Sequence, residues 1–359
     1  LHLLSRRQRQ MCIRDRFISI EKIRKGRDVL YMNEKALSVI GQYGLEVRKS
    51  VRTRGGIAVL TDDGYKLLYE CTRSDSYYER ENMITAGIKR TGFEYIDTYV
   101  MTAEGTLFSQ DAQGRKYILK DWFDAQECDI RNETHVAMAA GTLAVLHEHM
   151  MNMDKCEHEL KYNNATDMRM KFDKHTKEMR MVGNYLKGKK NKNEFEMLMR
   201  RSLMTFHEEA LIAAQELEEM DYGSRIEKAR TSYEMCHGSY NYHNVLFTDR
   251  GCAVTGFEHC CVDCQINDLY QFMRKLLEKN GWDARAGHSV IEAYSEVRPV
   301  SDDDMKLLRI NFLYPEKFWK VINFYNNSNK SWIPRKSIEK LEGVLAQNDA
   351  RKAFIETLH

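Results

Sequence analysis

The hydrophobic pattern of this 359-residue chain changes near Asp124, and that change limits the folds open to it. Before Asp124, short apolar stretches are separated by the turn-forming pairs Gly55-Gly56 and Asp63-Gly64, which is typical of antiparallel strands. We expect one helix at 74–89 and strands at 47–51, 57–60, 65–71, 93–102, 107–109 and 116–122. After Asp124, apolar residues recur every three or four positions, most regularly over 168–186 and 199–220, which predicts long amphipathic helices.

A second β segment interrupts the helical part. The apolar triplets 245–247 and 253–255 flank the turn Asp249-Arg250-Gly251, so we expect a β-hairpin there. This order of elements predicts an α+β, bilobed, protein-kinase-like fold, with a small antiparallel β N-lobe at 17–123 and a large helical C-lobe at 124–359. We leave residues 1–16 out of the fold prediction, because Met11 to Arg16 resembles a translated sequencing-library adapter.

Charge and hydropathy exclude several classes of protein. The chain has 55 Lys and Arg against 53 Asp and Glu, a formal charge of +2, so we expect no nucleic-acid partner. No stretch reaches the roughly 18 consecutive apolar residues of a membrane span, so we expect no membrane insertion. We also find no pattern of a signal peptide. Nine Cys in such a chain favour reduced thiols over a disulfide framework.

A kinase-like fold places its catalytic loop just before that hairpin. Kinases have His at the start of this loop, a catalytic-base Asp two residues later and a metal-binding Asn seven residues later. Here His237 and Asn244 fit the spacing, but the position of the base is Ser239. A serine hydroxyl is not a base near neutral pH and carries no charge to orient an attacking hydroxyl.

The second carboxylate of such a site is also missing. A magnesium-binding Asp is expected at the end of the second hairpin strand, and Gly256 occupies that position. Glu258 follows two residues later, so a bulge in the strand would be needed to bring it to the same place. We therefore expect no catalytic residues and no bound metal in a loop that retains only His237, Asn244 and their neighbours.

Candidate nucleotide-binding residues lie in the N-lobe. Gly55 and Gly56 could let backbone amides approach phosphates, although a tight turn explains them equally well. The third strand offers Lys66 as the phosphate-pairing lysine, and the following helix offers Glu79 and Glu81 as its ion-pair partners.

The chain from residue 17 onward resembles the CotS-type spore coat proteins of spore-forming Firmicutes, which are similar to aminoglycoside phosphotransferases and choline kinases. Its most specific motifs are Tyr117 to Phe123, Cys236 to Leu246, Asn267 to Leu269, Tyr314 to Lys320 and Trp332 to Pro334. The resemblance implies a coat protein that is assembled from the mother-cell cytoplasm and has other spore coat proteins as partners.

The same resemblance implies roles for individual residues. Members that keep the kinase signature have Asp at the position of Ser239 and Asp-Phe-Asp at the position of Gly256 to Glu258. The family lysine falls at Tyr69, which puts Lys66 out of register. Phe123 and Asp124 follow the interlobe hinge, which makes Phe123 a further candidate nucleotide-binding residue, and Asp268 would be the buried carboxylate that braces the catalytic loop.

Three functions remain open from the sequence. The first is a catalytically impaired pseudokinase that acts as a structural or scaffolding component of the spore coat, with no cofactor. The second is an active phosphotransferase for an alcohol or amine acceptor, which would use ATP and Mg²⁺ with Asn244, Glu258 and Asp263. The third is a thiol- or zinc-stabilised module, whose ligands would come from Cys236, His237, Cys252, His259, Cys260, Cys261 and Cys264. The sequence does not determine the oligomeric state.

Overall fold

The computed structural model describes residues 34–52, 56–154, 165–327 and 335–358. The adapter-like residues 1–16, Gly55 and the motif Trp332 to Pro334 lie outside this part of the chain. The chain divides into two compact units. The first contains the described residues of Leu1–Thr142, Glu148–Lys161 and Ser239–Cys260, and the second contains those of Leu143–His147, Tyr162–Gly238 and Cys261–His359.

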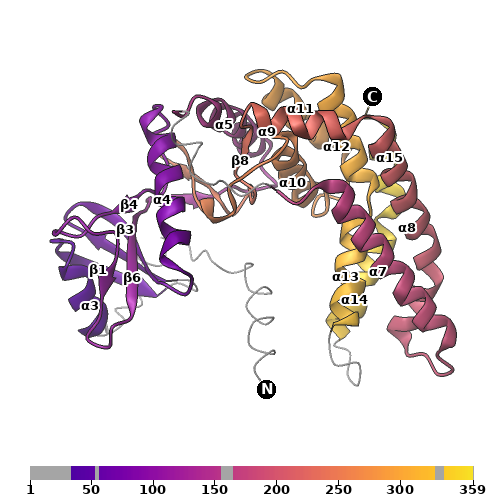
Figure 1. Cartoon of the computed structure of the whole chain (residues 1–359), viewed down its shortest axis with the longest axis horizontal. Coiled ribbons are helices and arrows are strands. Elements are labelled where there is room, and N and C mark those ends of the chain that lie inside the picture. The colour runs from indigo at the N-terminus through magenta and orange to yellow at the C-terminus, as the bar shows by residue number, and fades with distance from the viewer. Residues whose placement is uncertain (1–33, 53–55, 155–164, 328–334, 359) are drawn as a thin grey trace. The chain divides into compact units, whose positions relative to one another are not determined.

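The first unit contains an antiparallel sheet (Figure 1). Its order is β1-β2-β3-β6-β4, and β5 also pairs with β6. The strands are β1 (Val47–Arg52), β2 (Ile57–Thr61), β3 (Gly64–Glu70), β4 (Tyr99–Val100), β5 (Ser109–Gln110) and β6 (Lys116–Asp121). Gly64 has a φ of 82°, in the left-handed region that glycine enters without strain, and so completes the predicted tight turn between β2 and β3.

Two helices cover opposite faces of this sheet. Helix α3 (Glu34–Gly41) packs Val39 and Ile40 against Leu119 of β6. Helix α4 (Asp75–Arg90), which confirms the predicted helix, packs Tyr78 against Ile118. Because neighbouring residues of a strand point to opposite faces, Ile118 and Leu119 serve the two cores separately.

The segment expected as a strand at 93–102 is mostly irregular, and only Tyr99–Val100 pairs as β4. Its backbone bends at Ile96, whose amide donates to the Glu94 carbonyl, while the Thr98 amide donates to the Ile96 carbonyl. These local hydrogen bonds replace a ladder with a neighbouring strand. The bend brings Ile96 beside Val254 in an isolated bridge.

The predicted hairpin is confirmed in the first unit. Strands β9 (Val245–Thr248) and β10 (Gly251–Val254) pair antiparallel, with β7 (Gln126–Glu127) beside β9. A short 3₁₀ helix, η2 (Phe257–His259), follows the hairpin and contacts α4. Helix α5 (Glu133–Met151) contributes residues to both units.

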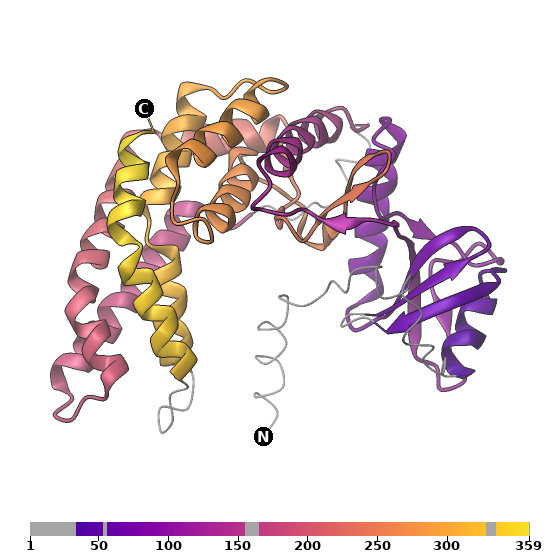
Figure 2. The same ribbon diagram turned by 180° about the vertical axis from the view of Figure 1, so that it is seen from behind.

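The second unit is helical apart from the short pair β8 (Met235–Cys236) and β11 (Cys261–Val262). Its helices are α7 (Met168–Gly188), α8 (Glu194–Glu219), α9 (Tyr222–Thr231), α10 (Ile266–Leu277), α11 (Ala284–Ser295), α12 (Asp302–Leu313), α13 (Glu316–Asn326), α14 (Arg335–Ala346) and α15 (Asn348–Glu356). Helices α7 and α8 form the predicted antiparallel pair, and α14 lies along α8 (Figure 2).

The apolar spacing of α7 positions its core residues as expected. The residues buried at three- and four-residue intervals are Met168, Phe172, His175, Met179, Val182 and Leu186. Helix α8 begins with a capping box, in which the Asn193 side chain accepts from the Glu196 amide and the Glu196 side chain accepts from the Asn193 amide. Both interactions satisfy backbone donors that a helix start otherwise leaves unpaired.

Candidate functional site

The start of the catalytic-loop segment is held by Asp268 in the second unit. The Asp268 carboxylate accepts from the His237 amide at 2.5 Å and from the Gly238 amide at 2.9 Å. His147 Nε2 lies 3.2 Å from the same carboxylate, and His147 Nδ1 lies 2.8 Å from the Tyr294 hydroxyl. These are the contacts that the bracing role implied for Asp268 requires.

Burial determines the charge of this brace. The side chains of His147 and Asp268 are both fully buried. Burial lowers the pKa of His147, although the hydrogen bond to Asp268 opposes the shift. A neutral imidazole has one donor and one acceptor, so Nε2–H donates to Asp268 and Nδ1 accepts from Tyr294. The buried Asp268 carboxylate is therefore satisfied by hydrogen bonds from neutral groups.

The rest of the loop belongs to the first unit and lacks a carboxylate. The Ser239 carbonyl accepts from the side-chain amides of Asn241 at 2.6 Å and Asn244 at 2.9 Å. Gly256 lies beside Asn244, since a Cβ built on Gly256 would be 3.2 Å from Asn244 Nδ2. The positions of the expected base and of the two expected metal ligands are thus Ser239, Asn244 and Gly256.

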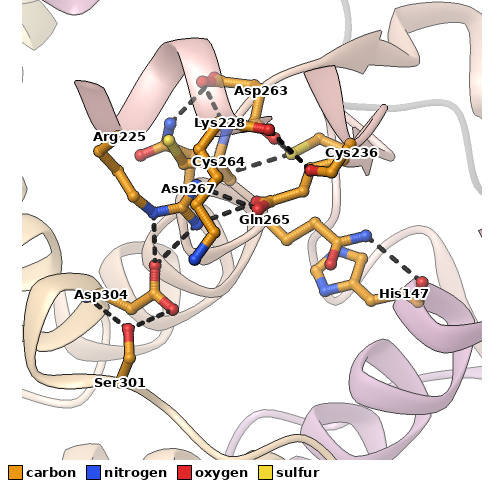
Figure 3. Close-up of polar contacts among 12 residues, drawn as sticks. His147, Arg225, Lys228, Cys236, Asp263, Cys264, Gln265, Asn267, Ser301 and Asp304 are labelled. Carbon is orange, nitrogen blue, oxygen red and sulfur yellow. Dashed lines mark hydrogen bonds and ion pairs between the residues drawn. The ribbon is translucent and has the colours of Figure 1, made fainter. Parts of the chain in front are cut away.

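Glu258 does not extend β10, because it belongs to η2 and is partly buried there. Its charge contributes to a raised pKa of Tyr77 on α4, about 12, for which burial of the Tyr77 hydroxyl is the larger cause. Asp263, the other acidic residue of the active alternative, lies in the second unit. Its carboxylate accepts from the Cys264 amide at 2.8 Å and from Asn267 Nδ2 at 2.9 Å (Figure 3), and burial raises its pKa to about 6.

The close-up of the second unit shows how this turn is supported (Figure 3). Gln265 donates from Nε2 to the backbone carbonyls of His147 and Met235. Arg225 forms ion pairs of 2.9 Å with both Glu234 and Asp304. The polar side chains around Asp263 therefore form hydrogen bonds and ion pairs within the fold, and they do not surround an open ligand-binding position.

A buried charge cluster that the sequence analysis missed lies in the first unit. Lys120 of β6 places Nζ 2.5 Å from Glu81 of α4 and 2.9 Å from Asp97. Tyr99 donates to the second Glu81 oxygen at 2.8 Å. The Gly256 amide donates to Asp97 Oδ2 at 3.3 Å, so the cluster touches the position of the absent metal-binding carboxylate.

The charges of this cluster depend on one another. Burial would lower the pKa of Lys120, but Asp97 and Glu81 outweigh it and hold that pKa well above its usual range. Burial raises the pKa of Asp97 to about 7, against the attraction of Lys120. Asp97 Oδ1 is buried and has no hydrogen-bond partner within the described residues.

Lys66 occupies the other face of the sheet. In the β3–β6 register, Lys66 lies opposite Asp121, while Leu67 lies opposite Lys120. Lys66 Nζ is 2.9 Å from both Asp121 and Asp63. Glu81 therefore pairs with Lys120 and not with Lys66. A local signal existed, because a lysine two residues after the buried Ile118 must share its face.

The remaining nucleotide-binding candidates have structural explanations or few contacts. A Cβ on Gly56 would lie 2.2 Å from the Leu68 carbonyl oxygen, so the close approach of β3 requires glycine there. Phe123 is partly buried in the connection between β6 and β7. Glu79, the other helix candidate, is exposed on α4, while Lys120 pairs with Glu81 and Lys66 with Asp121.

The cysteines do not assemble a metal site in the described residues, where no three His, Cys, Asp or Glu side chains are grouped to hold an ion. Cys236 lies opposite Cys261 in the β8–β11 pair, and its Sγ contacts the Cys264 carbonyl at 3.4 Å. Cys252 and Cys260 belong to the first unit. The zinc alternative therefore has no ligand group in this part of the chain.

Comparison with known proteins identifies the family. Residues 37–358 match the family model Spore_coat_YutH, described as "Spore coat putative kinase YutH". The chain belongs to this spore coat kinase family. The resemblance predicted from the sequence is thus confirmed, and membership implies the spore coat as the location.

Solved structures support the fold. An aminoglycoside phosphotransferase from Alicyclobacillus acidocaldarius is 17% identical, with a TM-score of 0.78 over 92% of this chain and 96% of that one. Spectinomycin phosphotransferase, solved with ADP and spectinomycin, is 13% identical, with a TM-score of 0.58 over 92% and 96%. A microcompartment-associated aminopropanol kinase is 14% identical, with a TM-score of 0.56 over 90% and 98%. The predicted bilobed kinase-like fold is confirmed, and within the described residues no helix is long and apolar enough to span a membrane.

Proposed function

We propose that this member of the spore coat kinase family has lost ordinary phosphotransfer and acts as a structural or scaffolding component of the coat. The observation that carries the proposal is the pair Ser239 and Gly256, which places a hydroxyl and a hydrogen where a base and a metal ligand belong. Its partners would be other spore coat proteins, and it would assemble from the mother-cell cytoplasm.

The residues around these positions do not fit Mg²⁺ with a nucleotide. Mg²⁺ in kinases needs carboxylate and amide oxygens in near-octahedral geometry. Asn244 supplies an amide, but Gly256 supplies no oxygen from a side chain. Asp97, the carboxylate in contact with the Gly256 amide, is already paired with Lys120.

The loss of the base has a separate cost. A positioned general base contributes about 10²- to 10⁴-fold to such reactions. The serine hydroxyl cannot accept the proton of an attacking alcohol or amine at neutral pH. In contrast, Asp268 and His147 stabilise the loop backbone and take no part in proton transfer, because hydrogen bonds within the fold use them fully.

Restoring both carboxylates tests the proposal. The experiment compares the parent, Ser239→Asp with Gly256→Asp, and the matched uncharged pair Ser239→Asn with Gly256→Asn. The measurements are Mg²⁺-dependent ATP hydrolysis and transfer of labelled γ-phosphate to small alcohols and amines. We expect no turnover above background for the parent and the Asn pair, and a gain for the Asp pair. The proposal is wrong if the parent turns over as fast as the Asp pair.

An active phosphotransferase is the second candidate, and one observation favours it. Kinases need an ion pair between a sheet lysine and a helix glutamate to hold the phosphates. Lys120 and Glu81 make such a pair, from β6 rather than from β3. On this alternative, ATP with Mg²⁺ should raise the melting temperature by several degrees in the parent and not in Lys120→Met. On our proposal, neither protein shows that shift.

A further inference from the structure

The motif Tyr314 to Lys320 plays no part in the kinase-like site, but it begins helix α13 of the second unit and carries unusual charge. Glu316, its first helical residue, accepts from Tyr270 at 3.3 Å. Lys320 lies 2.5 Å and Lys171 3.6 Å from the same carboxylate. These cations outweigh burial and hold the pKa of Glu316 well below its usual range. Glu316 is therefore ionised and already shared by two lysines.

A second carboxylate, at the C-terminal cap of α10, is shared in the same way. Glu278, the cap residue, lies 2.7 Å from Arg274 of α10 and 2.7 Å from Lys317 of α13. A third carboxylate, Glu178 on α7, accepts from Trp319 Nε1 at 2.7 Å. Each carboxylate of this region is thus bound by groups of the fold.

The cations outnumber these carboxylates. The basic cluster consists of five residues on three helices: Lys171, Arg274, Lys275, Lys317 and Lys320. Lys275 makes no ion pair with any residue in the described part of the chain. It is partly buried, and burial together with Arg274 and Lys320 lowers its pKa to about 8, against the weaker attraction of Glu278.

Two further features show that positive charge is in excess here. Arg274 Nε is buried and has no hydrogen-bond partner in the described residues. The pKa of Lys320 is also lowered, first by burial and then by Arg274, even though Glu316 opposes the shift. Crowded cations destabilise a fold unless an anion compensates them.

We propose that the basic cluster is a docking site for an acidic segment of a partner protein. Three of its lysines remain reachable, because the side chains of Lys171, Lys317 and Lys320 are 35%, 39% and 47% exposed. They lie on α7 and α13, so the positive surface extends across two helices and suits several linked carboxylates better than one small anion. The site is separate from the catalytic loop, so it does not depend on whether the chain transfers phosphate.

A labelled octaglutamate peptide tests this site by fluorescence anisotropy with the full chain. We expect saturable binding that weakens with salt, because each contact is between charges. Lys275→Glu should weaken binding at least about tenfold, which corresponds to about 1.4 kcal/mol. Lys275→Arg should retain it. Lys306→Glu is the matched control, because Lys306 is 61% exposed on α12 and pairs only with its neighbour Asp303 among the described residues.

Loss of folding cannot mimic the expected result. Lys275→Gln removes one positive charge from the crowded basic cluster. We therefore expect its melting temperature to be no lower than that of the parent, and its binding of the peptide to be weaker. The proposal is overturned if octaglutamate does not bind, or if Lys275→Glu and Lys306→Glu weaken it equally. It is also overturned if inorganic phosphate competes as strongly as the peptide, or if oligothymidylate binds more tightly than octaglutamate and depends on Lys275.

Discussion

The two parts of the catalytic-loop segment differ in what they keep. In the second unit, Asp268 holds the His237 and Gly238 amides and the ring of His147. In the first unit, the next residue is Ser239, and Gly256 stands beside Asn244. A bracing carboxylate raises the free energy of unfolding, whereas a catalytic base adds nothing to stability. Stability therefore preserves the first and not the second.

The largest expected effect is on the brace. Asp268→Ala removes the carboxylate that accepts from the buried His237 amide, the partly buried Gly238 amide and the Nε2–H of His147, and each buried group that loses its acceptor costs about 1–3 kcal/mol. We expect a loss of about 4 kcal/mol in the free energy of unfolding after partial relaxation, measured by urea denaturation. Asp268→Asn keeps one acceptor oxygen and should lose less. Equal stability of Asp268→Ala and the parent would contradict the bracing role.

Lys120→Met should be the next most damaging change. It leaves Glu81 and Asp97 buried without their cation, and breaking a buried ion pair on one side typically costs about 3–5 kcal/mol. Because Asp97 can take up a proton, we expect the lower end, about 3 kcal/mol. Lys66→Met is the matched control on the same sheet. A smaller loss for Lys120→Met than for Lys66→Met would show that the cluster is not a structural element.

The stability of the first unit should also depend on pH through Asp97. Its folded pKa of about 7 lies above the ordinary value of 3.8, so the folded state binds the proton more tightly. The contribution is complete below the ordinary value and is lost as pH rises through about 7. Asp97→Asn should therefore reduce the change of the melting temperature with pH between pH 4 and pH 7. An unchanged slope in that variant would assign the dependence to other groups.

Ser239→Ala should give the smallest effect. Alanine retains the backbone carbonyl of residue 239, which accepts from Asn241 and Asn244, and removes one hydroxyl from a partly buried position. We expect a change within about 0.5 kcal/mol and unchanged ATP hydrolysis at the background level. A loss as large as that of Asp268→Ala would remove the difference between the two parts of the loop.

Much of the fold could be predicted because its signals are local. Turn residues delimited β2, β3 and the β9–β10 hairpin, and three- and four-residue spacing identified the core of α7. The stretch around Ile96 was mispredicted as a strand, since its bend depends on hydrogen bonds between near neighbours that alternation does not reveal.

The candidate site was harder to predict because it depends on pairing between distant segments. The degenerate positions Ser239 and Gly256 could be read from spacing along the chain. Alternation alone places Lys120 on the face of Ile118, but its pairing with Glu81 could not be predicted, because that contact requires β3 to pair with β6 in one register and α4 to lie over this face. The excess charge around Lys275 likewise arises only when α7, α10 and α13 are brought together.

Gly256 has a φ of 84° and a ψ of 53°, a backbone conformation that aspartate and asparagine adopt more readily than other residues with side chains. The glycine codons that end in a pyrimidine become aspartate codons by one nucleotide substitution. The chain thus keeps, where kinases hold a metal-binding aspartate, a backbone conformation that admits aspartate with less strain than most replacements, although a Cβ there would lie only 3.2 Å from Asn244 Nδ2. On the proposed function, the loss at Gly256 is open to reversal by one such change, whereas Ser239 needs more than one.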